Sequence, residues 1–193
     1  MQSCSPASGN DLIEYHVGDA EPVDPSSSTK GYSERHIHSE VYKGHPSVQA
    51  AVHSHSEAVV PTISGVPLRP CYHMAGFLRA EGVLVYEISE HWRGGGGDKR
   101  DMLVSNEGLG AALAAHFDDG VAVTLMRGHG FTTVGDSIEE VVLRAVYTQK
   151  NSAIQNIAAL TTRAAYLVGG GHAGASQGGS GTCRRMRPRV LPR

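Results

Sequence analysis

The sequence predicts a layered α/β or α+β protein. Segments whose apolar residues recur at helical spacing alternate along the chain with short runs rich in β-branched residues. Glycine-containing turns, such as the one at 128–130, separate neighbouring runs in the manner of antiparallel strands. With 193 residues, of which 40% are hydrophobic and 19% charged, the chain fits one domain with a moderate core.

The first half of the chain predicts a helix followed closely by a strand. Residues 32–44 place Ile37 and Val41 four apart on one stripe, and Ser33 is an N-cap or first-turn residue. The other elements expected in this half are a short strand at 11–15, a strand ending through His55, a helix at 56–63 and an extended run at 82–88.

The second half predicts two helices and a pair of strands. Residues 121–126 are a continuous apolar, β-branched run typical of a buried strand, and a short strand at 131–134 follows a tight turn. Ser137 and Glu140 form a capping box for a long helix that reaches about Leu160. We also expect a loop at 92–98, a helix at 101–117, and a disordered Gly/Arg-rich tail at 169–193 after a folded domain at 1–168.

Composition argues against several classes of partner. A net charge of −2 gives no bulk field that favours nucleic acid, and no apolar run approaches the roughly 20 residues that span a bilayer. The N-terminus lacks the basic and apolar regions of a secretory signal. The three cysteines are far apart, so they predict neither a disulfide framework nor a CxxC metal site. We expect a cytoplasmic protein with a small-molecule substrate and no nucleic-acid or membrane partner.

Two histidines at the end of the first predicted strand are candidate metal ligands. His53 and His55 are two apart, so in a strand both side chains point to one face and offer two nitrogens to a single metal ion. The alternative is a chance pair on an exposed strand. The same spacing at His36 and His38 lies in a predicted helix, where residues two apart diverge by about 200° and cannot share a metal.

His129 and Glu34 are the next candidates. His129 lies between two glycines at the end of a buried strand, where a third nitrogen would complete a catalytic type of zinc site with one open position. It is otherwise a turn histidine without a partner. Glu34 begins a helix near the strand of His53, as an acid/base or only as a complement to the helix dipole. Tyr72 could line a pocket, and Arg127 could bind a carboxylate or phosphate.

Two separate segments resemble the class II aldolase/adducin family. The similarity covers roughly residues 11–165 in matching order and spacing. The first signature comprises Ser33–Tyr42, Pro46–Val48 and Ala51–His55, and the second comprises Arg127–Gly130 with Gly135.

The resemblance implies a three-layer αβα sandwich around a mostly antiparallel central sheet. Enzymes of the family bind Zn²⁺ or another divalent metal, such as Fe²⁺, Mn²⁺ or Co²⁺, through three histidines that match His53, His55 and His129. The family's acid/base glutamate matches Glu34, and Ser33 beside it joins Tyr72 and Arg127 as candidate substrate contacts. Many members are cyclic tetramers, so a homotetramer is expected.

The expected function is that of a metal-dependent carbon–carbon lyase of aldolase or decarboxylase type. It would act on a small hydroxy or keto acid, sugar-derived or aromatic, through a metal-stabilised enolate. The region before Glu34 is expected to be shortened and lacks the family's glycine-containing phosphate motif, which favours a non-phosphorylated substrate. The alternatives are an inactive adducin-like interaction protein and an iron-dependent oxygenase with the same three histidines.

Overall fold

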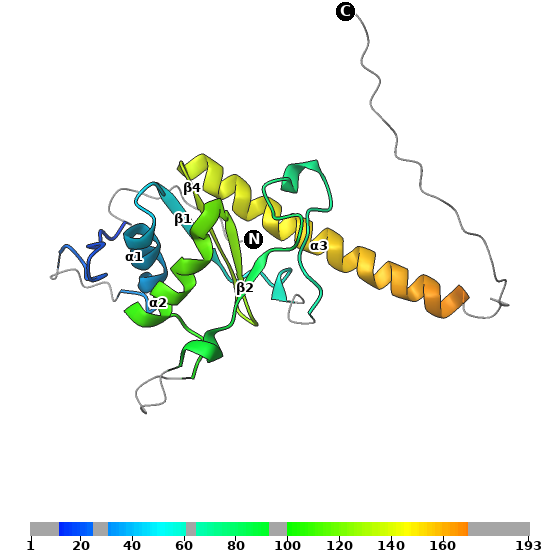
Figure 1. The fold of residues 1–193 in the computed structure, drawn as a ribbon, viewed down its shortest axis with the longest axis horizontal. Helices are drawn as coiled ribbons and strands as arrows, with labels where there is room; N and C mark the ends of the chain where they lie inside the picture. The colour runs from blue at the N-terminus through cyan, green and yellow to red at the C-terminus, as the bar shows by residue number, and fades with distance from the viewer. Residues whose placement is uncertain (1–11, 25–30, 61–64, 93–99, 170–193) are drawn as a thin grey trace, which may run out of the picture.

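A mixed sheet of four strands in the order β1-β4-β3-β2 forms the centre of this computed structural model (Figure 1). The structure describes residues 12–24, 31–60, 65–92 and 100–169. β4 pairs antiparallel with both β1 and β3, whereas β2 is parallel to β3, which confirms the mostly antiparallel sheet. The strands are β1 Ala50–Ser54, β2 Leu84–Tyr86, β3 Val123–Met126 and β4 Gly130–Gly135.

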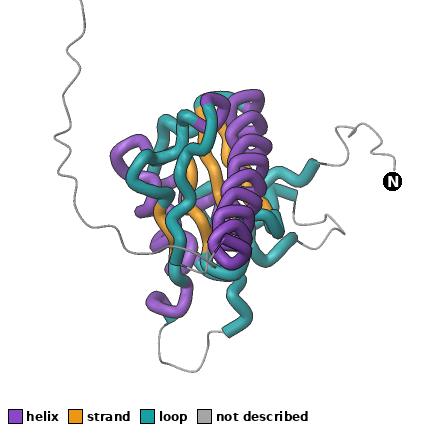
Figure 2. Tube along the Cα trace, turned by 90° about the vertical axis from the view of Figure 1, so that its right-hand side faces the viewer, coloured by secondary structure: helices purple, strands orange, loops and turns teal. Residues whose placement is uncertain are grey.

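Helices cover both faces of this sheet, so the expected αβα layering is confirmed. α1 (Arg35–Gly44) and α2 (Glu107–Ala114) pack against each other over one face, and α3 (Ile138–Gly169) runs along the other face against β1 and β4 (Figure 2). Among the described residues, no helix combines the length and hydropathy needed to cross a bilayer. Three short 3₁₀ helices complete the described fold: η3 His73–Ala75, η4 Ile88–His91 and η5 Ala115–Gly120.

The alternation of side chains along β3 and β4 divides the core in two. Leu125 and its cross-strand partner Phe131 are each 1% exposed and belong to the cluster that also contacts Ala145 of α3. Met126 and Val134 point the other way, into clusters formed with side chains of α1 and α2. The alternation of side chains along the strands therefore determines which residues can reach the N-terminus of α1.

The segment at 101–106 is not helical, contrary to the sequence prediction of a helix at 101–117. Asn106 is the N-cap, and its side chain accepts a hydrogen bond from the Leu109 amide at 3.0 Å, so α2 begins only at Glu107. Ahead of the cap, the Asp101 carboxylate accepts from the Leu103 amide at 3.1 Å, and Met102 has a left-handed φ of 64°. These local hydrogen bonds compete with the helix that the apolar spacing favours.

The helix expected at 56–63 is also wrong over its described part, 56–60. Residues 57–59 form a turn, with the Val59 amide bonded to the Ser56 carbonyl at 3.1 Å, and Val60 is in 3₁₀ rather than α-helical conformation. Residues 61–64 lie outside the described part.

Several other boundaries shift. The first helix begins at Arg35 rather than residue 32, and the last one continues past Leu160 to Gly169. The predicted capping box is present, because Ser137 Oγ accepts from the Glu140 amide at 3.2 Å. In place of the short strand at 11–15, Tyr15 makes one bridge to Pro22. Residue 11, most of the predicted loop at 92–98 and the tail from 170 lie outside the described residues.

Candidate metal centre

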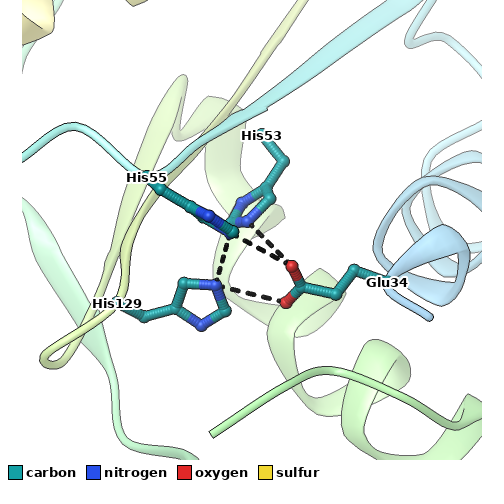
Figure 3. A group of neighbouring side chains, drawn as sticks. All are labelled: Glu34, His53, His55 and His129. Carbon is teal, nitrogen blue, oxygen red and sulfur yellow. Dashed lines mark hydrogen bonds and ion pairs between the residues drawn. The ribbon is translucent and has the colours of Figure 1, made fainter. Parts of the chain in front are cut away.

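The side chains of Glu34, His53, His55 and His129 converge on one point (Figure 3). One possible ligand atom from each lies within 4.8 Å of those of the other three. Three separate parts of the chain supply them: the start of α1, the end of β1, and the turn between β3 and β4. The fold thus brings together residues almost a hundred positions apart.

β1 carries the first two histidines to the centre. His53 lies opposite Thr132 in the β1–β4 pairing, on the face covered by α1, and His55 is the first residue beyond the described strand. Their ring centroids are 4.7 Å apart, so both side chains reach the same side as the strand period predicted. Their surroundings differ: the His53 side chain is 9% exposed, and that of His55 is 59% exposed.

Two glycines shape the turn that carries His129. Gly128 has a φ of 66°, which glycine adopts without steric cost. A Cβ on Gly130 would lie 2.0 Å from the Ser54 carbonyl oxygen, so only glycine allows the strands to approach this closely beside His55. His129 Nε2 then lies 2.8 Å from His55 Nε2.

Glu34 is buried at the middle of the three imidazoles. Its carboxylate oxygens lie 3.1 Å from His55 Nε2, 3.2 Å from His129 Nε2 and 3.4 Å from His53 Nε2. It is the N-cap residue of α1, but its side chain makes no capping hydrogen bond. The carboxylate is therefore directed at the histidines rather than at the helix terminus.

The electrostatics of the cluster favour an ionised glutamate. Burial by itself raises the pKa of Glu34, but the contacts with His129 and His53 outweigh burial and hold that pKa well below its usual range. Burial likewise lowers the pKa of His129, and the contact with Glu34 outweighs it, so the pKa of His129 is raised. Each group of this pair therefore stabilises the charged form of the other.

The donor set fits a divalent metal. His53 Nδ1 lies 3.3 Å from Thr132 Oγ1, and His129 Nδ1 lies 2.9 Å from the Met102 carbonyl, which leaves the Nε2 atoms facing the centre. His53 Nε2 is buried without a well-oriented hydrogen bond, as expected of a nitrogen meant for a metal. Three neutral imidazole nitrogens are the ligand set of catalytic zinc sites with an open position.

The structure places the remaining predicted residues differently from one another. Ser33 lines an open pocket of about 640 Å³ beside His53 and His55. Arg127 lies next to the centre, where it pairs with Glu87 at 2.5 Å. Tyr72 is not brought to the cluster, because it is partly buried against the core on the α3 side, with its ring centroid 6.2 Å from that of Tyr147.

The second predicted histidine pair is divided by α1, as its helical spacing implied. His38 lines the pocket beside His53, and its pKa falls to about 4 through burial and then through the neighbouring His53. His36 is not among the residues that line that pocket. Three supporting groups were not predicted from the sequence: Thr132 Oγ1, the Met102 carbonyl, and the Val104 amide, which donates to the Glu34 carboxylate at 3.3 Å. Two of these are backbone atoms, for which no residue type gives a signal.

Comparisons with known proteins agree with this fold. Residues 4–156 match the family described as Class II Aldolase and Adducin N-terminal domain. L-fuculose-1-phosphate aldolase from Thermus thermophilus is a structural neighbour with a TM-score of 0.57, covering 88% of this chain and 76% of that one. Its identity is 22%, so this likeness shows the fold alone.

Curated relatives are decarboxylases by name. The chain is 47% identical over 176 residues to Decarboxylase tropJ of Talaromyces stipitatus, covering 87% of this chain and 65% of the relative. It is 36% identical over 115 residues to the 3,4-dihydroxyphthalate decarboxylase of Terrabacter sp., covering 57% of this chain and 43% of that one. The chain thus spans less than two thirds of the length of these relatives.

An αβα sandwich with three histidines at the ends of its strands and one glutamate at the start of a helix defines a class II aldolase-type protein. The chain belongs to the class II aldolase and adducin family.

Proposed function

We propose that the protein is a metal-dependent decarboxylase, a carbon–carbon lyase. Its substrate would be a small aromatic or keto acid that carries a hydroxyl group near the carboxylate. The observation that carries this proposal is the contact of one buried, ionised carboxylate, Glu34, with all three imidazoles. The decarboxylase names of the relatives support the reaction type.

His53, His55 and His129 would hold the metal, which is Zn²⁺ or another divalent ion such as Fe²⁺, Mn²⁺ or Co²⁺. When bound, such an ion supplies Lewis-acid stabilisation of negative charge on a substrate oxygen. The exposed side of His55 and the pocket lined by Ser33 provide the approach for the substrate. Ser33 is therefore retained as a substrate contact, and Tyr72, which packs on the α3 side, is not.

Glu34 moves the proton in the proposed reaction. The carboxylate accepts the proton of the substrate hydroxyl, which places negative charge on that oxygen. Cleavage of the carbon–carboxylate bond releases CO₂ and leaves its electron pair on the ring or α carbon. Glu34 returns the same proton to that carbon, and a proton from water restores the hydroxyl, so the net change is replacement of the carboxylate by hydrogen with one proton taken up from solvent.

Release of CO₂ tests this proposal. Protein loaded separately with Zn²⁺, Mn²⁺, Co²⁺ or anaerobic Fe²⁺ is incubated with 3,4-dihydroxyphthalate and a panel of hydroxylated aromatic and keto acids. We expect metal-dependent CO₂ release, with one solvent deuterium entering the product in D₂O. Aldol cleavage products, oxygen consumption without CO₂, or the absence of stoichiometric metal would each overturn it.

We also propose a cytoplasmic homo-oligomer, with a tetramer expected from the family. Apolar side chains on the outer part of α3 support self-association, since Ile157 and Leu160 are 65% and 69% exposed. An exposed free thiol at Cys71 suits a reducing compartment. Light scattering on the purified protein tests the oligomer, and a monomer at micromolar concentration would contradict it.

A further inference from the structure

One short segment contacts both the acid/base carboxylate and a histidine of the centre. The Met102 carbonyl oxygen lies 2.9 Å from His129 Nδ1, and two residues later the Val104 amide donates to Glu34 Oε1 at 3.3 Å. The two partners come from different elements: His129 from the β3–β4 turn and Glu34 from the start of α1. Neither contact depends on the identity of a side chain in the segment.

The contact at Met102 determines which nitrogen of His129 carries the proton. A carbonyl oxygen can only accept, so Nδ1 must be the donor. Only the charged ring, protonated on both nitrogens, can also donate from Nε2 to Glu34 at 3.2 Å; in the neutral ring the proton on Nδ1 leaves the lone pair on Nε2. Without that acceptor, either tautomer is open to the ring.

The segment is built to hold this conformation. The Asp101 carboxylate accepts from the Leu103 amide at 3.1 Å, and Met102 takes a φ of 64°, which is uncommon for a residue with a side chain. A Cβ on Gly128 would lie 2.9 Å from the Met102 methyl carbon, so the glycine leaves room for that side chain. Val104 is fully buried among the side chains between α1 and α2, which anchors the other end.

We propose that the segment Asp101–Val104 is the positioning element of the metal centre: its Met102 carbonyl fixes the tautomer of His129, and its Val104 amide orients Glu34. The proposal rests on the roles proposed above for these two residues. The segment touches neither substrate nor metal and acts through the groups that do.

A matched pair of substitutions tests the proposal. Met102→Gly keeps the carbonyl and adopts a positive φ freely, whereas Met102→Val places a β-branched residue where it is strongly disfavoured. ¹⁵N NMR of the neutral imidazole of His129 in metal-free protein reports its tautomer. Competition with a chelator for Co²⁺ reports metal affinity.

We expect wild type and Met102→Gly to show the Nδ1–H tautomer and affinities within about threefold of each other. Met102→Val should show mixed tautomers and an affinity lower by roughly tenfold to a hundredfold. Asp101→Ala removes only the acceptor of the Leu103 amide. It should therefore change the tautomer and the metal affinity in the same direction as Met102→Val, but by less. If Met102→Val does not fold, Asp101→Ala serves as the test.

Two results would overturn the proposal. One is a wild-type tautomer and affinity in every folded variant of Met102 and Asp101. The other is an equal loss in Met102→Gly and Met102→Val, which would assign the effect to the side chain. The tautomer of His129 is measured without metal or substrate. The role of the segment can therefore be tested even if the protein decarboxylates none of the acids.

Discussion

The two faces of the central sheet have the same backbone and opposite chemistry. The face toward α3 is closed by apolar side chains such as Leu125 and Phe131, both 1% exposed. The face toward α1 and α2 carries His53 and its cross-strand partner Thr132, and Glu34 reaches His53 there. Adjacent residues of one strand thus serve either stability or chemistry according to the face they occupy, and substitutions on the two faces should have separable effects.

The largest expected effect is on the chemical face. Glu34→Gln keeps the size of the side chain but cannot accept a proton, so CO₂ release should fall by roughly 10²–10⁴-fold. Metal content by elemental analysis should remain stoichiometric, because the histidines are unchanged. Glu40→Gln is the matched control, a buried glutamate on the same helix paired with Lys43, and its turnover should match wild type. Equal losses in both variants would deny Glu34 a special role.

The next effect belongs to the apolar face. Leu125→Ala removes a buried side chain packed below α3 and should lower the free energy of unfolding by about 2–5 kcal/mol. Urea denaturation measures this loss. Bound metal per folded molecule should stay at the wild-type value, and a parallel loss of metal would show that the two faces are not independent.

Metal itself should stabilise the fold through the chemical face only. At a free metal concentration about a hundred times the Kd, binding adds about 2.7 kcal/mol to the free energy of unfolding. This increment should appear in wild type and in Leu125→Ala, and should vanish in His53→Ala. Thermal melts with and without a chelator provide the measurement. An increment that survives in His53→Ala would place the metal elsewhere.

The smallest expected effect comes from a comparison of two neighbouring threonines, both fully buried. Thr132 faces His53 Nδ1 at 3.3 Å, whereas Thr133 donates to the Ala122 carbonyl at 2.8 Å on the other face. Thr132→Val should weaken Co²⁺ binding roughly tenfold by freeing the His53 ring. Thr133→Val should leave Co²⁺ affinity unchanged, as judged by chelator competition. The comparison fails if both variants bind alike.

The spacing of apolar residues, together with the glycines and the helix-capping residues, determined much of this arrangement. The period of a strand placed His53 and His55 together, and the glycines around His129 predicted a turn at the end of a buried strand, because these are local steric properties. The capping box at Ser137 was also predicted from the sequence, and the structure contains it. The resemblance to the family favoured Glu34 as the acid/base, whereas the residues alone left it between that role and a complement to the helix dipole.

Only the tertiary structure decided how these residues meet. It buried His53 and left His55 exposed, directed Glu34 into the histidines, and moved Tyr72 away toward α3. It also replaced the predicted start of a helix at 101 with a turn whose carbonyl and amide support the centre. Backbone groups are the same in every residue, so their use as partners depends on three-dimensional packing and not on the local pattern of side chains.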